Sequence, residues 1–190
     1  RDFCLSRGLG DVYKRQAEYA RFGKMAYTAK LRNGLFRNTG ACMAPQTAFY
    51  NLIGMETLGL RMERACSNAK VLAEFLNTYP DITVNYPGLA CSPWHDVADK
   101  VLANGYGAIL TIRVGSKERA FSVINNLSIP KIVSNIGDTK TLIIHPESTL
   151  NAHSTEKEKE DAGVFDDLIR ISVGIEDIED LIEDFKAALA

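Results

Sequence analysis

The stretch DDLIRISVGIEDIEDL, from Asp166 to Leu181, holds a strand pattern that runs directly into a helix pattern. Over 168–173 the residues alternate between two faces, and one face of the expected strand carries Ile169, Ile171 and Val173. The other face carries Arg170 at its centre. A guanidinium group stays charged in a protein, and burying it requires an anion close by. The stretch therefore predicts an anionic partner for Arg170.

That partner could belong to the chain or to a ligand. Carboxylates near the ends of the same strand could pair with the arginine inside the protein, namely those of Asp166, Asp167 and Glu176. Alternatively, Arg170 could hold an anionic ligand in a binding site. Taken alone, the residues favour the ion pair within the chain, and both interpretations stay open.

The rest of the C-terminal half alternates between strand and helix patterns. We expect strands near 83–86, 108–114, 131–134, 141–145 and 168–173. Helical spacing of apolar residues predicts helices around 94–102, 121–127 and 178–189. Short joins between strands, such as SNIGDTKT, favour an α+β fold with helices on one face of a mostly antiparallel sheet.

Two of the expected helices carry clear start signals. Thr155 and Glu158 are spaced as a capping box for a short charged helix, which Gly163 could close. The surrounding charge run, STEKEKED, predicts a solvated helix face. The last helix begins with acidic residues that suit the positive end of a helix dipole, Glu176, Asp177, Glu179 and Asp180.

The N-terminal part of the chain predicts a long helical segment. Residues 17–37 are weakly helical, and a stronger pattern runs from Pro45 until Pro80 ends it. About 34 helical residues would extend roughly 50 Å. Gly54 and Gly59 are positions where such a helix could bend or split. A helix of this length often connects two domains.

These patterns divide the chain into three expected parts. Residues 1–16, RDFCLSRGLGDVYKRQ, lack periodicity and resemble a recurrent artefact of assembled reading frames, so we exclude them from the fold. Residues 17–80 are the expected helical connector, and residues 81–190 are the expected α+β domain. The native chain would then begin upstream of Ala17, and the sequence would be a truncated piece.

The composition is that of an ordinary globular protein, with 46% hydrophobic and 24% charged residues over 190 positions. The formal net charge of -2 gives no reason to expect a nucleic-acid or membrane partner. No apolar run reaches the roughly 20 residues of a membrane span. The 4 cysteines are widely spaced and match no Cys-x-x-Cys or zinc pattern, which indicates reduced thiols in a cytoplasmic protein.

Three other motifs have simpler explanations than catalysis. His145 and His153 match no zinc spacing and lack a third ligand, so no metal site is expected. The glycines of NGYGAIL lead into a strand, whereas a phosphate loop leads into a helix, so they predict a turn. Ser148 and Thr149 have no base placed beside them, and loop hydrogen bonding is the favoured interpretation.

Two motifs in this order, SNIGDTKTLIIHPESTLNAHS and DDLIRISVGIEDIEDLIEDFKAAL, resemble the C-terminal part of a known family. It comprises the pyridoxal-phosphate (PLP) enzymes of cysteine and methionine metabolism, among them cystathionine γ-synthase, cystathionine γ-lyase and methionine γ-lyase. NGYGAILTIRVGS resembles the glycine-led strand of that domain, and APQTAFYNLIGMETLGLRMERACSNAKVLAEFL resembles the helical connector before it. The resemblance covers about 17–190 and implies the C-terminal domain of a fold-type I PLP enzyme that assembles as a homodimer or homotetramer.

One branch of the family fits the loop sequence best. Asn135-Ile136-Gly137 followed by DTKTLIIHP resembles O-acetylhomoserine sulfhydrylases, which make homocysteine from O-acetylhomoserine and sulfide, whereas many other members carry Ser-Leu-Gly. The segment ESTLNAH is longer than the usual Ser-Thr-Thr-His. The cystathionine and methionine γ-lyase branches therefore stay open.

The resemblance implies substrate-binding roles for individual residues. Arg170 matches the arginine that binds the α-carboxylate of an amino-acid substrate, a task that suits its planar fork. Ser134 and Asn135 match positions beside that carboxylate. Thr149 is expected nearby.

The resemblance also implies a lysine that this sequence lacks. The family binds PLP covalently through the lysine of a Ser-x-Thr-Lys motif in the preceding domain, and neither Lys30 nor Lys140 stands in such a motif. We expect the intact parent to be a PLP-dependent enzyme, and this chain to contain no catalytic residue and to be inactive by itself. The alternatives are an amino-acid-binding module without chemistry and a structural piece that buries interface.

Overall fold

The computed structural model describes residues 19–102 and 104–190, and the expected artefact at 1–16 lies outside them. The chain divides into two compact units between Ile53 and Gly54, and each is described by itself. Helical segments make up most of the described part of the first unit, which confirms the helical prediction for the described part of 17–37. They are the 3-10 helix Gly23–Met25, α2 Ala26–Lys30, the π-helix Leu31–Phe36, α3 Arg37–Thr39 and α4 Pro45–Glu56, whose end enters the second unit.

The long helical pattern is split, as the glycines predicted. Thr57, with φ -108° and ψ 5°, interrupts the helical conformation between α4 and α5, Leu58–Leu76. Buried residues of α5 lie in its C-terminal two-thirds, at Ala65, Asn68, Ala69, Leu72, Ala73 and Leu76. Helix α5 therefore packs within the second unit, while the domain boundary placed after residue 80 stays a prediction.

One sheet of five strands forms the centre of the second unit, in the order β1-β2-β5-β4-β3. The strands are β1 Thr83–Asn85, β2 Ile109–Arg113, β3 Lys131–Ile132, β4 Leu142–Ile144 and β5 Leu168–Ser172. Neighbours pair antiparallel except β3 and β4, which are parallel. The predicted α+β fold with a mostly antiparallel sheet is confirmed, and each expected strand is present with slightly shorter ends.

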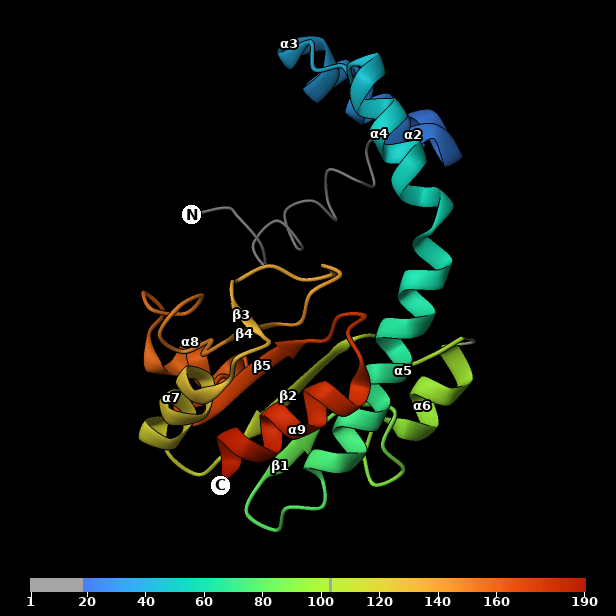
Figure 1. Cartoon of the computed structure of the whole chain (residues 1–190). Coiled ribbons are helices and arrows are strands. Elements are labelled where there is room, and N and C mark those ends of the chain that lie inside the picture. Colours follow the sequence, from blue (N-terminus) through green and yellow to red (C-terminus); the bar gives the residue numbers. More distant parts are fainter. Residues whose placement is uncertain (1–18, 103) are drawn as a thin grey trace. The chain divides into compact units, whose positions relative to one another are not determined.

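Helices α5, α7 (Lys117–Asn126) and α9 (Ile178–Leu189) pack against one face of the sheet, as Figure 1 shows. The predicted capping box is confirmed at the start of α8 (Glu156–Asp161), because Thr155 and Glu158 each bond the other's backbone N–H. Asp177 caps α9 by accepting from the backbone N–H of Glu179. None of the helices in the described residues is long and apolar enough to cross a membrane.

Strand register decides which side chains share a face with Arg170. On the core face, the paired residues of β2 and β5 are Ile112 with Ile169 and Leu110 with Ile171, and all belong to the main hydrophobic core. Arg170 itself pairs with Thr111 of β2 and with Ile144 of β4. Because side chains alternate along a strand, these residues lie on the opposite face of the sheet.

The apolar spacing at 94–102 predicted a helix, and α6 (His95–Val101) is present. Its apolar residues are mostly uncovered in this chain. Ala98 is buried, whereas Val97 is 56% exposed and Val101 is 70% exposed. The spacing of residues therefore indicated the helix correctly, but it could not indicate which segment covers that helix.

Candidate functional site

Arg170 lies at the centre of β5, between β2 and β4, on the face away from the core. The side chain is half-buried. Its Nη2 donates to the backbone carbonyl of Ser134 at 3.2 Å and to that of Asn135 at 3.4 Å. The structure thus brings together three of the four residues that the resemblance implied, although Ser134 and Asn135 contact the arginine through their backbone.

The ion pair expected within the chain does not form. Asp167 pairs with Arg113 at 2.8 Å, and the carboxylate of Glu176 accepts from the N–H and the hydroxyl of Thr141. Across the residues that the structure describes, no carboxylate lies within ion-pair distance of Arg170. The interpretation of Arg170 as an ion-pair partner of Asp166, Asp167 or Glu176 is therefore wrong, and most of its five N–H donors are left for another acceptor.

Thr149 uses its hydroxyl in the turn that follows β4. Its Oγ1 donates to the carbonyl of His145 at 2.7 Å, and the residue is exposed. The structure gives no hydrogen bond between Thr149 and Arg170 in the described part of the chain. The loop hydrogen bonding predicted for Thr149 is confirmed, whereas its role beside a substrate stays a prediction.

Both ring nitrogens of His145 are engaged inside the protein. Nε2 lies 2.6 Å from the carbonyl of Asp166, which can only accept, so Nε2 carries the proton. Nδ1 then accepts from the hydroxyl of Ser148 at 2.8 Å, and the ring packs on Phe121. This arrangement leaves neither nitrogen for a metal ion. No group of potential metal ligands was found in the described ranges, 19–102 and 104–190.

Glu147, which the sequence did not single out, holds the turn after β4 in place. Its carboxylate pairs with Lys117 of α7 at 2.8 Å and with Lys159 of α8 at 2.7 Å. The hydrogen bonds from these lysines lower the pKa of Glu147 to about 2. Lys159 is only 12% exposed, so the charge run at α8 is not a fully solvated face. The role of Glu147 depends on the fold, which brings Lys117 of α7 and Lys159 of α8 to one carboxylate.

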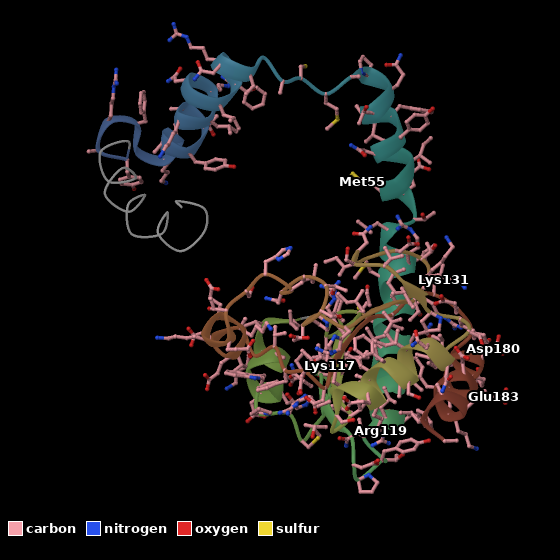
Figure 2. All side chains as sticks on the ribbon, turned by 90° about the vertical axis from the view of Figure 1, so that its left-hand side faces the viewer. Met55, Lys117, Arg119, Lys131, Asp180 and Glu183 are labelled. Atoms are coloured by element: carbon pink, nitrogen blue, oxygen red, sulfur yellow. The ribbon has the colours of Figure 1, made fainter. Side chains whose placement is uncertain are left out.

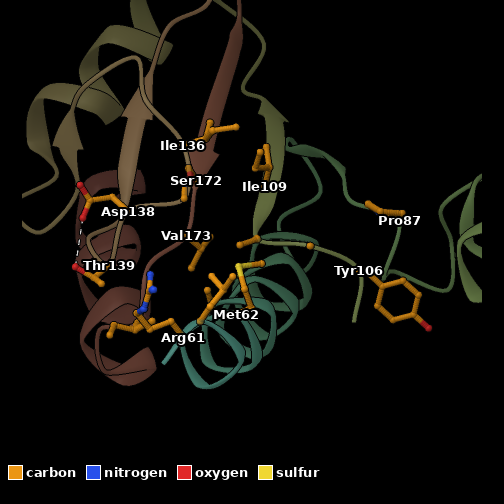
Figure 3. Close-up of a pocket in the computed structure, with 16 residues that line it drawn as sticks. Arg61, Met62, Pro87, Tyr106, Ile109, Ile136, Asp138, Thr139, Ser172 and Val173 are labelled. Carbon is orange, nitrogen blue, oxygen red and sulfur yellow. Dashed lines mark hydrogen bonds between the residues drawn. The ribbon is translucent and has the colours of Figure 1, made fainter. Parts of the chain in front are cut away.

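A pocket of about 450 Å³ opens at the end of β5, beside Ser172, as Figure 3 shows. Its walls are mostly apolar and include Met62 of α5 and Tyr106 from the turn before β2. Gly137 closes one side by donating its N–H to Ser172 Oγ at 3.2 Å. None of the four predicted substrate-binding residues lines it. Sequence reasoning missed this pocket, because its walls come from segments that are distant along the chain.

The family model for Cys/Met metabolism PLP-dependent enzymes matches residues 12–190, and the chain belongs to this family. L-methionine gamma-lyase of Fusobacterium nucleatum subsp. polymorphum is 43% identical over 158 residues, which cover 82% of this chain and 40% of that protein. Homocysteine synthase of Schizosaccharomyces pombe is 43% identical over 170 residues, which cover 88% of this chain and 40% of that protein. The chain thus spans about 40% of the length of these curated relatives.

Solved structures show the same fold. A candidate O-acetylhomoserine (thiol)-lyase of Campylobacter jejuni, which contains a pyridoxyl-lysine phosphate, matches with a TM-score of 0.82 and 36% identity. The match covers 89% of this chain and 41% of that one. O-Acetylhomoserine sulfhydrylase of Wolinella succinogenes matches with a TM-score of 0.74 and 35% identity, over 92% of this chain and 47% of that one. The predicted family and its dependence on PLP are confirmed.

Arg170 fits the amino-acid end of such a reaction, but the sequence does not provide the lysine motif that the family uses for the cofactor. Arg170 offers a carboxylate-binding fork, but a covalent PLP site also needs a lysine with a free amino group. No lysine of the sequence stands in a Ser-x-Thr-Lys motif. No step through PLP is therefore assigned to residues of this chain.

Proposed function

We propose that this chain is the C-terminal part of an O-acetylhomoserine sulfhydrylase, an enzyme that exchanges the acetate of O-acetylhomoserine for sulfide and yields homocysteine. Arg170 is the residue that binds the α-carboxylate of the substrate. The observation that carries the proposal is a half-buried guanidinium with no carboxylate partner in the described residues. A charge in that position requires an anion, and an amino-acid substrate supplies one.

The geometry around Arg170 suits the binding of a substrate carboxylate and the orientation of that substrate. Because one nitrogen of Arg170 already donates to two carbonyls, the planar fork is held in one orientation, and its remaining donors can meet both oxygens of a carboxylate. A substrate fixed at its carboxylate keeps its reacting carbons in a constant position, which accelerates a reaction by lowering its entropic barrier. When bound in the parent enzyme, PLP supplies the sink for the electrons released at the substrate carbons. Ser134, Asn135 and Thr149 would line the carboxylate end of the site.

The relatives support this branch and one neighbour. Homocysteine synthase and O-acetylhomoserine sulfhydrylases occur among the proteins that the chain resembles. L-methionine gamma-lyase is equally similar at 43% identity, so a γ-lyase parent is the second candidate. Both reactions begin with the same amino-acid carboxylate, and Arg170 has the same role in each.

The PLP-binding lysine is proposed to lie in a preceding domain, so that this chain is inactive by itself and acts within a cytoplasmic homodimer or homotetramer of the parent. The test is to extend the reading frame upstream of Ala17 and to express the longer protein. A Ser-x-Thr-Lys lysine and formation of homocysteine from O-acetylhomoserine and sulfide would support the proposal. Release of methanethiol from methionine without homocysteine formation would favour the γ-lyase parent.

Two further results would contradict the proposal. A longer reading frame with no such lysine would favour an amino-acid-binding module without chemistry. Turnover by the 190-residue chain in the presence of PLP would show that its inactivity was wrongly inferred. An Arg170→Ala variant of the longer protein separates the site from the reaction class, because it should lose substrate affinity whichever thiol is the acceptor.

A further inference from the structure

The orientation of Arg170 depends on a segment of the chain that is exposed and is not held in place by packing in the core. Residues 133–140 connect β3 to β4, and all of them are exposed. The carbonyls of Ser134 and Asn135 in this segment accept the hydrogen bonds from Arg170. An exposed connection keeps a fixed position only if hydrogen bonds anchor it. Its middle is anchored by the N–H of Gly137, which donates to Ser172 Oγ, and its C-terminal end by further hydrogen bonds, so these contacts together determine the orientation of the guanidinium.

The contacts at the C-terminal end of the segment converge on Glu176. One carboxylate oxygen accepts from the backbone N–H of Thr141 at 2.6 Å, and the other accepts from the Thr141 hydroxyl at 2.9 Å. Thr141 is fully buried, and its hydroxyl also accepts from the N–H of Gly174 at 2.9 Å. The segment is further joined to the same region by the N–H of Ile175, which donates to the carbonyl of Thr139 at 2.9 Å. Glu176 thus binds the residue at which the exposed connection enters β4.

Glu176 is itself held against α5. Its backbone carbonyl accepts from Nδ2 of Asn68 at 2.8 Å and from Nη2 of Arg64 at 3.3 Å. Asn68 is 2% exposed and also donates to the carbonyl of Gly174 at 3.1 Å. The carboxylate is therefore placed by a helix of the core, and it transmits that placement to Thr141.

We propose that Glu176 is a positioning residue for substrate binding: through Thr141 it fixes the 133–140 segment, whose carbonyls orient Arg170. This inference rests on the proposed role of Arg170 and adds a residue that the resemblance did not assign. Glu176 does not touch the substrate. It affects the fraction of molecules in which the guanidinium of Arg170 has the orientation that binds a carboxylate.

Two pairs of variants separate positioning from general stability. Thr141→Val keeps the shape of the side chain but removes the hydroxyl, whereas Thr141→Ser restores the hydroxyl. Glu176→Gln replaces one of the two acceptor oxygens by a donor, so the N–H and hydroxyl of Thr141 cannot both donate to it. Glu183→Gln makes the same change of charge on α9, where the side chain is exposed (Figure 2). Together they form two matched comparisons.

The first measurement needs no ligand. In the ¹⁵N-labelled 190-residue chain, the side-chain signals of Arg170 are identified by their loss in Arg170→Lys. We expect them to be ordered in the wild type, Thr141→Ser and Glu183→Gln, and flexible in Thr141→Val and Glu176→Gln. Unchanged Arg170 signals in both of the latter variants would overturn the proposal. If Thr141→Val does not fold, Glu176→Gln decides.

The second measurement uses the longer, PLP-loaded protein. Thr141→Val and Glu176→Gln should raise KM for O-acetyl-L-homoserine about tenfold with kcat within about twofold, because the lost hydrogen bonds alter binding and not the reacting groups. Thr141→Ser and Glu183→Gln should behave as the wild type. If Arg170→Ala leaves KM unchanged, the proposed function fails, while the ligand-free signals still decide whether Glu176 positions Arg170.

Discussion

The carboxylate of Asp167 forms its ion pair with Arg113 on the neighbouring strand, at 2.8 Å, and not with Arg170 three residues along the chain. It also accepts from the backbone N–H of Gly115 at 3.1 Å, and Arg113 packs on the ring of Phe165. The carboxylate of Asp167, which directly precedes β5, is therefore occupied by Arg113 and Gly115 at the end of the strand. Arg170 is left with two backbone carbonyls as its partners in the described residues.

Replacing Arg170 tests whether that arrangement is a binding site. In the longer, PLP-loaded protein, Arg170→Ala should raise KM for O-acetyl-L-homoserine about 100-fold, because two charge-assisted hydrogen bonds amount to about 3 kcal/mol. Arg113→Ala is the matched control. It removes the same charge from the adjacent strand and should leave KM unchanged while lowering the free energy of unfolding by about 1 kcal/mol. Equal kinetic effects of the two variants would contradict the assignment.

Glu147 should make the stability of the chain sensitive to acid. Its pKa is about 2 in the folded protein and 4.5 when unperturbed, so the unfolded state takes up a proton first as the pH falls. The ion pairs with Lys117 and Lys159 therefore stabilise the fold fully above pH 4.5, and this contribution is lost as the pH falls towards 2. Urea unfolding of Glu147→Gln between pH 7 and pH 2 should show a smaller loss than the wild type. An identical pH profile would contradict the role of this carboxylate.

The capping box of α8 should stabilise the helix that carries Lys159. Thr155→Ala removes the side-chain acceptor for the N–H of Glu158 and should destabilise the helix by about 1 kcal/mol. Amide hydrogen exchange within 156–161 should therefore become faster, whereas Thr155→Ser should keep the protection. Unchanged exchange in the alanine variant would show that packing, and not the cap, holds this helix.

Gly174 should not tolerate a side chain. A Cβ at this position would lie 2.4 Å from a carboxylate oxygen of Glu176 and 2.4 Å from the carbonyl oxygen of Thr139. Gly174→Ala should therefore lower the free energy of unfolding by about 2–3 kcal/mol, because backbone atoms have to move apart. Gly59→Ala is the control, since no atom lies within 4 Å of the added Cβ and alanine favours the helix by up to about 1 kcal/mol. Comparable losses in both variants would argue against the close approach at Gly174.

Much of the fold could be predicted because its signals are local. Alternation over a few residues marked the strands, Thr155 and Glu158 marked a helix start, and Pro80 marked a helix end. Such patterns depend on the pleat of a strand and the pitch of a helix, which involve neighbours in sequence. The exposed apolar side chains of α6 show the limit of this reasoning, because a stripe indicates a helix but not what covers it.

By itself, the sequence determined that a charged residue stands in an apolar strand, and the motifs around it indicated the family to which the chain belongs. Only the tertiary structure decided which anion each cation meets. Strand register places Asp167 beside Arg113, which is 54 positions away in the sequence, and the connections between strands bring the carboxylate of Glu176 to Thr141, which is 35 positions away. A charged side chain pairs with the group that the fold places within hydrogen-bond distance, and this distance cannot be read from the spacing of residues in the sequence. For Arg170, the described residues supply two backbone carbonyls and no carboxylate.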